Sequence, residues 1–281
     1  KGGKKKLFIN ALNTTKDIVI ALETHLAKPD LNLSKMDGIV IQNPGTDRSA
    51  GIIIATKNKE VVITNVVHHV KGRSTSFLLD SDSERTLVFV IYAPNIPADQ
   101  LEFYETLLES IAVEDAKNLN TTLMILGDFN FTMKPKIDRS TKNDGQSHSR
   151  SREKIIEILA TYNLKDLWRT LHEKIPGHTF SRADKSSRID MFLVSSCLIP
   201  KIHELKIGNG VGSDHFELRM VYTPLENIER GPGSWKFNTS MLQDKKFREV
   251  TMKNKLIQEK MIARRDILSP LCQLEYILKK C

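Results

Sequence analysis

The sequence has few cysteines and no long apolar run. Its three cysteines, Cys197, Cys272 and Cys281, are odd in number and far apart, which excludes a disulfide framework and a zinc-ligand spacing. No stretch approaches the roughly 18 apolar residues of a membrane-spanning helix, and the lysine-rich start lacks the apolar core of a signal peptide. We therefore expect a protein of a reducing compartment that is not secreted and has no membrane partner.

The net charge of +8 is concentrated at the two ends of the chain. Residues 1–6 contain four lysines, and residues 223–281 contain 12 basic and 7 acidic residues, so residues 7–222 carry a net charge of −1. A basic protein is often a nucleic-acid binder. Charge alone is equally consistent with solvated lysines on terminal segments.

Short apolar runs rich in valine and isoleucine recur through the first 222 residues. Two amphipathic stretches, near 98–114 and 150–162, predict helices. The apolar runs predict strands at 18–22, 38–42, 51–56, 61–67, 76–79, 87–92, 122–126, 189–194 and 215–221. Most strands follow one another at hairpin-like distances, which favours an α/β fold with mixed or mostly antiparallel sheets over a regular βαβ repeat.

Two segments differ from this pattern. Residues 132–150 are polar and predict a long surface loop, either a flexible connection or an element that contacts a nucleic-acid groove. A boundary is expected after Tyr222, because Thr223-Pro224 ends the last strand and Gly231-Pro232-Gly233 follows. We therefore expect a domain over 1–222 and a basic, partly helical segment over 223–281.

Polar residues stand at the ends of five apolar runs. Neighbouring strands of a sheet end close to one another, so side chains from several strand ends can converge on one site. Each residue alone is better explained as a turn former or a packing residue, but their joint occurrence indicates a site. The five motifs are Glu23-Thr24-His25, Tyr92-Ala93-Pro94-Asn95, Gly127-Asp128-Phe129-Asn130, Arg188-Ile189-Asp190 and Ser213-Asp214-His215.

These residue types suit hydrolysis of a phosphodiester. Glu23, Asp128 and Asp214 offer the hard oxygen ligands that Mg²⁺ takes, with Mn²⁺ as a substitute. Asp190 could fix the tautomer of His215, as in sites where a histidine must be oriented. Asn130 and Tyr92 are neutral donors for a phosphoryl oxygen that gains charge. The set predicts metal-assisted attack by water.

In this order the five motifs resemble the endonuclease/exonuclease/phosphatase superfamily over about residues 18–222. Further segments resemble the endonuclease domain of LINE-type non-LTR retrotransposons: Asp138-Arg139-Ser140, Trp168-Arg169-Thr170-Leu171-His172, His178-Thr179-Phe180 and Arg188-Ile189-Asp190. Residues 231–240 resemble the connector that leads from that domain toward reverse transcriptase.

The resemblance implies a four-layer α/β sandwich, with two facing mixed or antiparallel sheets flanked by helices and the active site at one edge. Its implied roles are metal binding by Glu23 and Asp214, an acid/base pair of Asp190 and His215, and substrate binding by Thr179, Ser213 and Arg188. Asp128, Asn130 and Tyr92 would act on the water and the scissile phosphate. Either Asp128 or His215 could take the proton of the water, and we favour Asp128, with His215 stabilising the phosphorane.

The same resemblance implies a nuclear Mg²⁺-dependent endonuclease that nicks DNA to prime reverse transcription, with retrotransposon RNA and reverse transcriptase as partners. An abasic-site repair endonuclease of the same fold is an alternative. The family begins with a strand carrying an asparagine, whereas this chain opens at Lys1-Gly2-Gly3-Lys4. We therefore expect the first strand to be missing, which leaves a non-catalytic nucleic-acid-binding fragment as a third hypothesis.

Overall fold

The computed structural model describes residues 13, 18–46, 49–80, 84–141, 148–208 and 213–222. The chain divides into two units, Lys1–Asn227 and Ile228–Cys281, and all described residues lie in the first. The segment expected over 223–281 falls outside the described residues, as do residues 1–17 apart from Asn13. The expected boundary after Tyr222 stays a prediction.

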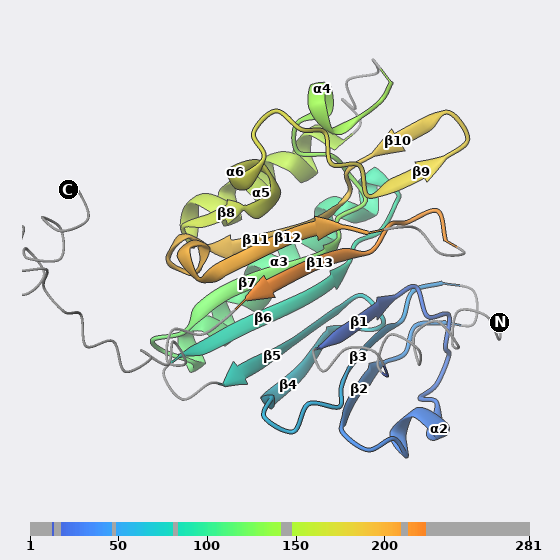
Figure 1. Cartoon of the computed structure of the whole chain (residues 1–281), viewed down its shortest axis with the longest axis vertical. Helices are drawn as coiled ribbons and strands as arrows, with labels where there is room; N and C mark the ends of the chain where they lie inside the picture. Colours follow the sequence, from blue (N-terminus) through green and yellow to red (C-terminus); the bar gives the residue numbers. More distant parts are fainter. Residues whose placement is uncertain are drawn as a thin grey trace, which may run out of the picture. The chain divides into compact units, whose positions relative to one another are not determined.

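A six-stranded sheet forms the centre of the described unit (Figure 1). Only β6 and β7 run parallel, and the 21-residue helix α3 (Pro97–Lys117) supplies the crossover that a parallel pair needs. All other neighbours in this sheet are antiparallel. Its order is β4 (Val62–Val70), β5 (Ser74–Asp80), β6 (Arg85–Tyr92), β7 (Thr122–Asp128), β11 (Asp190–Ser195) and β8 (Leu164–Asp166).

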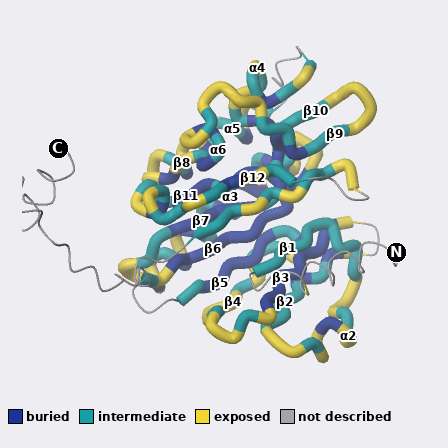
Figure 2. Tube along the Cα trace, in the orientation of Figure 1, coloured by how far each residue is buried: buried dark blue, intermediate teal, exposed yellow. Residues whose placement is uncertain are grey.

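The central strands are buried on both faces (Figure 2). Side chains alternate between the two faces of a strand. Leu87, Phe89 and Ile91 of β6 therefore pack in a core with residues of α3 and of α5 (Ser149–Thr161). Val88 and Val90 join a second core on the opposite face. Because both faces are covered, β6 is apolar at nearly every position.

A second layer of strands packs on that opposite face. It consists of the sheet β1–β3–β2 (Val19–Leu22, Ile52–Thr56, Ile39–Asn43) and the pair β12–β13 (Ile202–Ile207, Leu218–Tyr222). Both pieces contribute residues to the second core, including Ile52, Ile54 and Leu205. The expected α/β fold with facing sheets flanked by helices is confirmed, although the second sheet is in two pieces within the described residues.

Short elements complete the described fold. They are the hairpin β9–β10 (Phe180–Arg182, Lys185–Ser187), the helices α2 (Leu31–Ser34), α4 (Pro135–Asp138) and α6 (Leu167–Leu171), and the 3-10 helix η2 (Ser196–Lys201). None of the helices in the described ranges is long and apolar enough to cross a membrane.

Both expected helices and all nine expected strands are present, with small shifts at their ends. The last strand starts at Leu218, and His215 forms only an isolated bridge with Phe180. The prediction of a surface loop over 132–150 is wrong for the first part of this range, because Thr132 and Asp138 are buried and α4 lies there. Asp138 can be buried because it forms ion pairs with Arg169 and Arg188, which are distant from it in the sequence.

Candidate active site

Three neighbouring strands align three of the predicted residues at one edge of the central sheet. Tyr92 is the register partner of Asp128 across β6 and β7, and Asp128 is the partner of Asp190 across β7 and β11. Gly127 makes this alignment possible. Its φ is +136°, and a Cβ there would lie 1.9 Å from the Ile91 carbonyl oxygen, so only glycine permits the close approach of β6 and β7.

His215 reaches this row of residues from the segment before β13. The backbone N–H of Phe216 donates to the Thr179 carbonyl at 2.7 Å, and that of Ser181 donates to the Asp214 carbonyl at 2.8 Å. His215 Nδ1 then lies 2.9 Å from Asp190 Oδ2, and its Nε2 lies 4.0 Å from Asp128 Oδ2. The imidazole therefore stands between two carboxylates, hydrogen-bonded to one of them.

The electrostatics of this group favour a charged histidine. Burial by itself lowers the pKa of His215, but the hydrogen bond and charge of Asp190, followed by Asp128 and Asp214, raise it to about 9. Burial and the charge of Asp190 raise the pKa of Asp128 well above its usual range. His215 is thus an imidazolium near neutral pH, while burial and the neighbouring Asp190 make the Asp128 carboxylate a stronger proton acceptor than an ordinary aspartate.

The shifted pKa of His215 predicts a pH-dependent contribution to stability. Since the pKa rises from 6.5 in the unfolded chain to about 9 in the folded one, the stabilisation is complete below about pH 6.5 and is lost as pH rises through 9. In metal-free urea unfolding, the stability advantage of wild type over His215→Gln should shrink across this window. His203→Gln, at an exposed histidine of β12, is the control. A constant difference would contradict the assigned ion pair.

Glu23 lies at the end of β1 and contacts the same group. Its φ is +51°, a conformation uncommon outside glycine, and its Oε1 accepts a hydrogen bond from the Tyr92 hydroxyl. Burial and this hydrogen bond raise the pKa of Tyr92, so the hydroxyl stays protonated. The Arg73 guanidinium lies 5.1 Å from the centre of the Tyr92 ring and donates to the Tyr92 carbonyl at 3.2 Å.

Sequence reasoning missed Arg73. It directly precedes β5, whereas three of the five predicted motifs follow an apolar run. The Gly72-Arg73 pair just before β5 was the available signal.

Asn130 is held beside Asp128 by two hydrogen bonds. Its backbone N–H donates to Asp128 Oδ1 at 2.7 Å, and its side-chain Nδ2 donates to the Ala93 carbonyl at 2.7 Å. Its φ of +52° belongs to the left-handed region that asparagine tolerates better than most residues. The amide is therefore fixed in orientation next to the carboxylate.

The remaining predicted residues divide into two groups. Ser213 and Asp214 are exposed next to His215, and Ser213 Oγ accepts from the His215 backbone N–H at 3.1 Å. Thr179 is fully buried, and its Oγ1 accepts from the backbone N–H groups of Ile189 and Asp190. It orients Asp190 rather than meeting solvent.

Arg188 does not reach the site. Its side chain is 1% exposed and is bound to Asp138 and Asp166. The prediction that Arg188 contacts substrate is therefore replaced by a buried structural position. A buried guanidinium requires carboxylate partners, and those of Arg188 lie on α4 and β8, away from the site.

The donor atoms present fit a divalent cation. A carboxylate oxygen of Asp128 and one of Asp190 lie within 4.8 Å of each other, and a ring nitrogen of His215 lies within the same distance but, in the imidazolium form, has no lone pair to offer a metal. The negative charge of Glu23 also contributes to the raised pKa of Asp128, so a cation would relieve repulsion among these carboxylates. Such oxygen donors suit Mg²⁺. Glu23 stays the leading predicted ligand, and Asp214, the second predicted ligand, is exposed next to His215.

Comparison with known proteins connects this geometry to nucleases. Residues 86–219 match the sequence profile of a family described as endonuclease-reverse transcriptase. The chain is 26% identical over 238 residues to a transposon TX1 uncharacterized 149 kDa protein of Xenopus laevis. This match covers 80% of the chain and 17% of that relative, so the chain spans about a sixth of the relative's length.

Solved structures share the fold. The AP endonuclease LMAP from Leishmania major superposes with a TM-score of 0.66 at 18% identity, covering 79% of this chain and 83% of that one. The chain has an endonuclease/exonuclease/phosphatase fold. The 3' phosphatase NExo from Neisseria, bound to a product DNA hairpin, shares this fold with a TM-score of 0.64 at 18% identity, covering 79% and 95% of the two chains. The predicted resemblance to nucleases and to a transposon protein is confirmed.

Proposed function

We propose that this chain is a Mg²⁺-dependent endonuclease that nicks one strand of DNA and leaves a 3′-hydroxyl that primes reverse transcription. The observation that carries the proposal is the Asp190–His215 pair next to Asp128, with Tyr92 in register beside it. The endonuclease-reverse transcriptase profile and the transposon relative support the retrotransposon setting. Retrotransposon RNA, a reverse transcriptase and action in the nucleus follow as parts of the same proposal.

The roles follow from the charges of the groups. Asp128, with its raised pKa, takes the proton of the attacking water. His215, an imidazolium oriented by Asp190, stabilises the negative charge that develops on the phosphoryl oxygens. A histidine with a pKa of about 9 is a poor proton acceptor at neutral pH, which supports Asp128 over His215 as the base.

Neutral donors and the metal complete the proposed site. Tyr92, protonated and fixed by Glu23 and Arg73, and Asn130, fixed by Ala93, would contact the scissile phosphate. Glu23 would hold the metal, with Asp214 as the second predicted ligand. When bound, the metal would supply Lewis-acid neutralisation of phosphate charge.

Nicking of supercoiled plasmid tests the proposal. With the 281-residue chain and Mg²⁺, we expect conversion of supercoiled to open-circular DNA, and addition of excess EDTA should remove this activity. The nicked product should serve as a primer for a DNA polymerase without further treatment, because its end is a 3′-hydroxyl. Salt-sensitive DNA binding without any metal-dependent nick would instead favour the non-catalytic binding fragment.

A repair function is the second candidate, favoured by the likeness in fold to an AP endonuclease. An oligonucleotide duplex with a tetrahydrofuran abasic analogue distinguishes the two. Incision of the intact duplex at a rate comparable to the abasic duplex supports the retrotransposon role. Strong preference for the abasic duplex would overturn it in favour of repair.

A further inference from the structure

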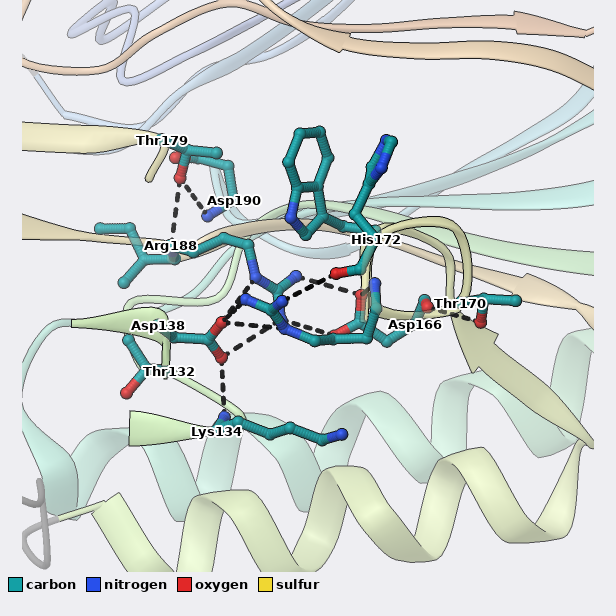
Figure 3. Close-up of polar contacts among 12 residues, drawn as sticks. Thr132, Lys134, Asp138, Asp166, Thr170, His172, Thr179, Arg188 and Asp190 are labelled. Carbon is teal, nitrogen blue, oxygen red and sulfur yellow. Dashed lines mark hydrogen bonds and ion pairs between the residues drawn. The ribbon is translucent and has the colours of Figure 1, made fainter. Parts of the chain in front are cut away.

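Four charged residues form a buried cluster, and Figure 3 shows three of them, Asp138, Asp166 and Arg188, together with Asp190. Asp138 accepts from Arg169 Nη2 at 2.5 Å and from Arg188 Nε at 2.9 Å, while Arg188 Nη2 also binds Asp166 at 2.6 Å. The side chains of Asp138 and Arg188 are 0% and 1% exposed. We call Asp138, Asp166, Arg169 and Arg188 the buried charge cluster. With two carboxylates and two guanidinium groups, it is electrically balanced.

The cluster joins the segments that converge on the start of β11. Arg188 precedes Asp190 by two residues, and its backbone N–H donates to the Asp138 carbonyl at 2.9 Å. Asp166 is the register partner of Leu193 in β11 and caps α6 by accepting from the Arg169 backbone N–H at 3.3 Å. Contacts with Asp138 of α4 and Asp166 of β8 thus fix the position of Asp190, the first residue of β11.

Arg169 extends the cluster to the segment before Thr179. Its guanidinium donates to the carbonyls of four residues, at 2.6 to 3.2 Å: His172, Glu173, Ile175 and Pro176. Three residues later Thr179 accepts from the backbone N–H of Asp190, and its carbonyl accepts from that of Phe216. One guanidinium therefore fixes the segment that orients both Asp190 and the neighbour of His215.

Buried ion pairs of this kind are weak contributors to net stability, because the loss of hydration offsets much of their attraction. A guanidinium differs from an ammonium in its planar set of five N–H donors with fixed directions. The N–H groups of Arg169 donate to four carbonyls and to the Asp138 carboxylate in fixed directions, and a lysine ammonium cannot reproduce this arrangement. The contacts thus specify a geometry rather than a charge.

We propose that the buried charge cluster, through Arg169, is a positioning device that sets the hydrogen bond between Asp190 and His215. This inference rests on the proposed function for its consequence in catalysis. Its structural content, the geometry of that hydrogen bond, can be measured without any activity.

Arg169→Lys is the main test, because it keeps the charge and loses the directed donors. We expect kcat for nicking to fall about 10- to 100-fold, as for other small displacements of catalytic groups, with KM within about threefold of wild type. In protein labelled with ¹⁵N at histidine, the Nδ1–H proton signal of His215, assigned by its loss in His215→Gln, should shift or broaden. Asp138→Asn, nearly isosteric, gives the same readouts if the lysine variant does not fold.

Lys201→Met is the matched control. Lys201 and Glu84 form an ion pair at 2.5 Å with side chains 15% and 11% exposed, at the opposite end of β6 from Tyr92. This variant should lower the Tm while leaving kcat and the His215 signal unchanged. If Arg169→Lys behaves like this control, the cluster is structural only and the inference is overturned. If the wild type does not nick DNA, the proposed function fails, and the His215 signal still decides the inference.

Discussion

Replacing Asp190 with asparagine is expected to reduce kcat for DNA nicking by about 10⁴-fold, the scale known for loss of the carboxylate that orients a catalytic histidine. Asp190 Oδ2 lies 2.9 Å from His215 Nδ1 and is the largest favourable influence on the charged form of that imidazole. An asparagine amide of the same size lacks the charge that holds the proton on His215. The pKa of His215 should therefore fall, and less of the imidazolium would be present at neutral pH.

The measurement is single-turnover nicking of a labelled duplex, with circular dichroism to establish that the variant folds. Asp80→Asn is the matched control, because Asp80 pairs with Arg85 at the opposite end of β6 from Tyr92. It should retain wild-type nicking. A loss of less than about tenfold for Asp190→Asn would mean that His215 is not oriented by this carboxylate, and the assigned acid/base pair would be wrong.

The residues at strand ends could be predicted because the apolar runs before them are unambiguous. Leu87–Ile91 and Thr122–Leu126 read as strands from composition alone, which puts Tyr92 and Asp128 at strand ends. The alignment of the two could not be read from the sequence. It depends on the parallel register of β6 and β7, and a shift of one residue would have turned Asp128 to the other face.

The residues that were misjudged are those whose partners are distant along the chain. The family resemblance of the motif Arg188-Ile189-Asp190 predicted a substrate contact for Arg188, yet its partners Asp166 and Asp138 are 22 and 50 residues away. The hairpin β9–β10 was missed for a related reason. Its strands, Phe-Ser-Arg and Lys-Ser-Ser, carry too few apolar residues to show an alternating pattern.

Asp128→Ala is expected to lower the nicking rate by about 10³- to 10⁴-fold, toward the upper limit for removal of a general base. Asp128 is 4% exposed, has a raised pKa and lies beside the donors Asn130 and Tyr92. Because alanine leaves space where the carboxylate stood, added formate should restore part of the rate. Rescue should grow with formate concentration and be absent in wild type.

The same experiment distinguishes the two candidate bases. If His215 took the proton of the water, formate would have no effect on Asp128→Ala, and imidazole would instead rescue His215→Ala with a rate that rises with the neutral imidazole fraction. We expect the opposite, since a His215 pKa of about 9 keeps the imidazole protonated at neutral pH. If Asp128 is the base, the imidazolium form of added imidazole should rescue His215→Ala. This rescue should therefore decline as pH rises through the pKa of free imidazole.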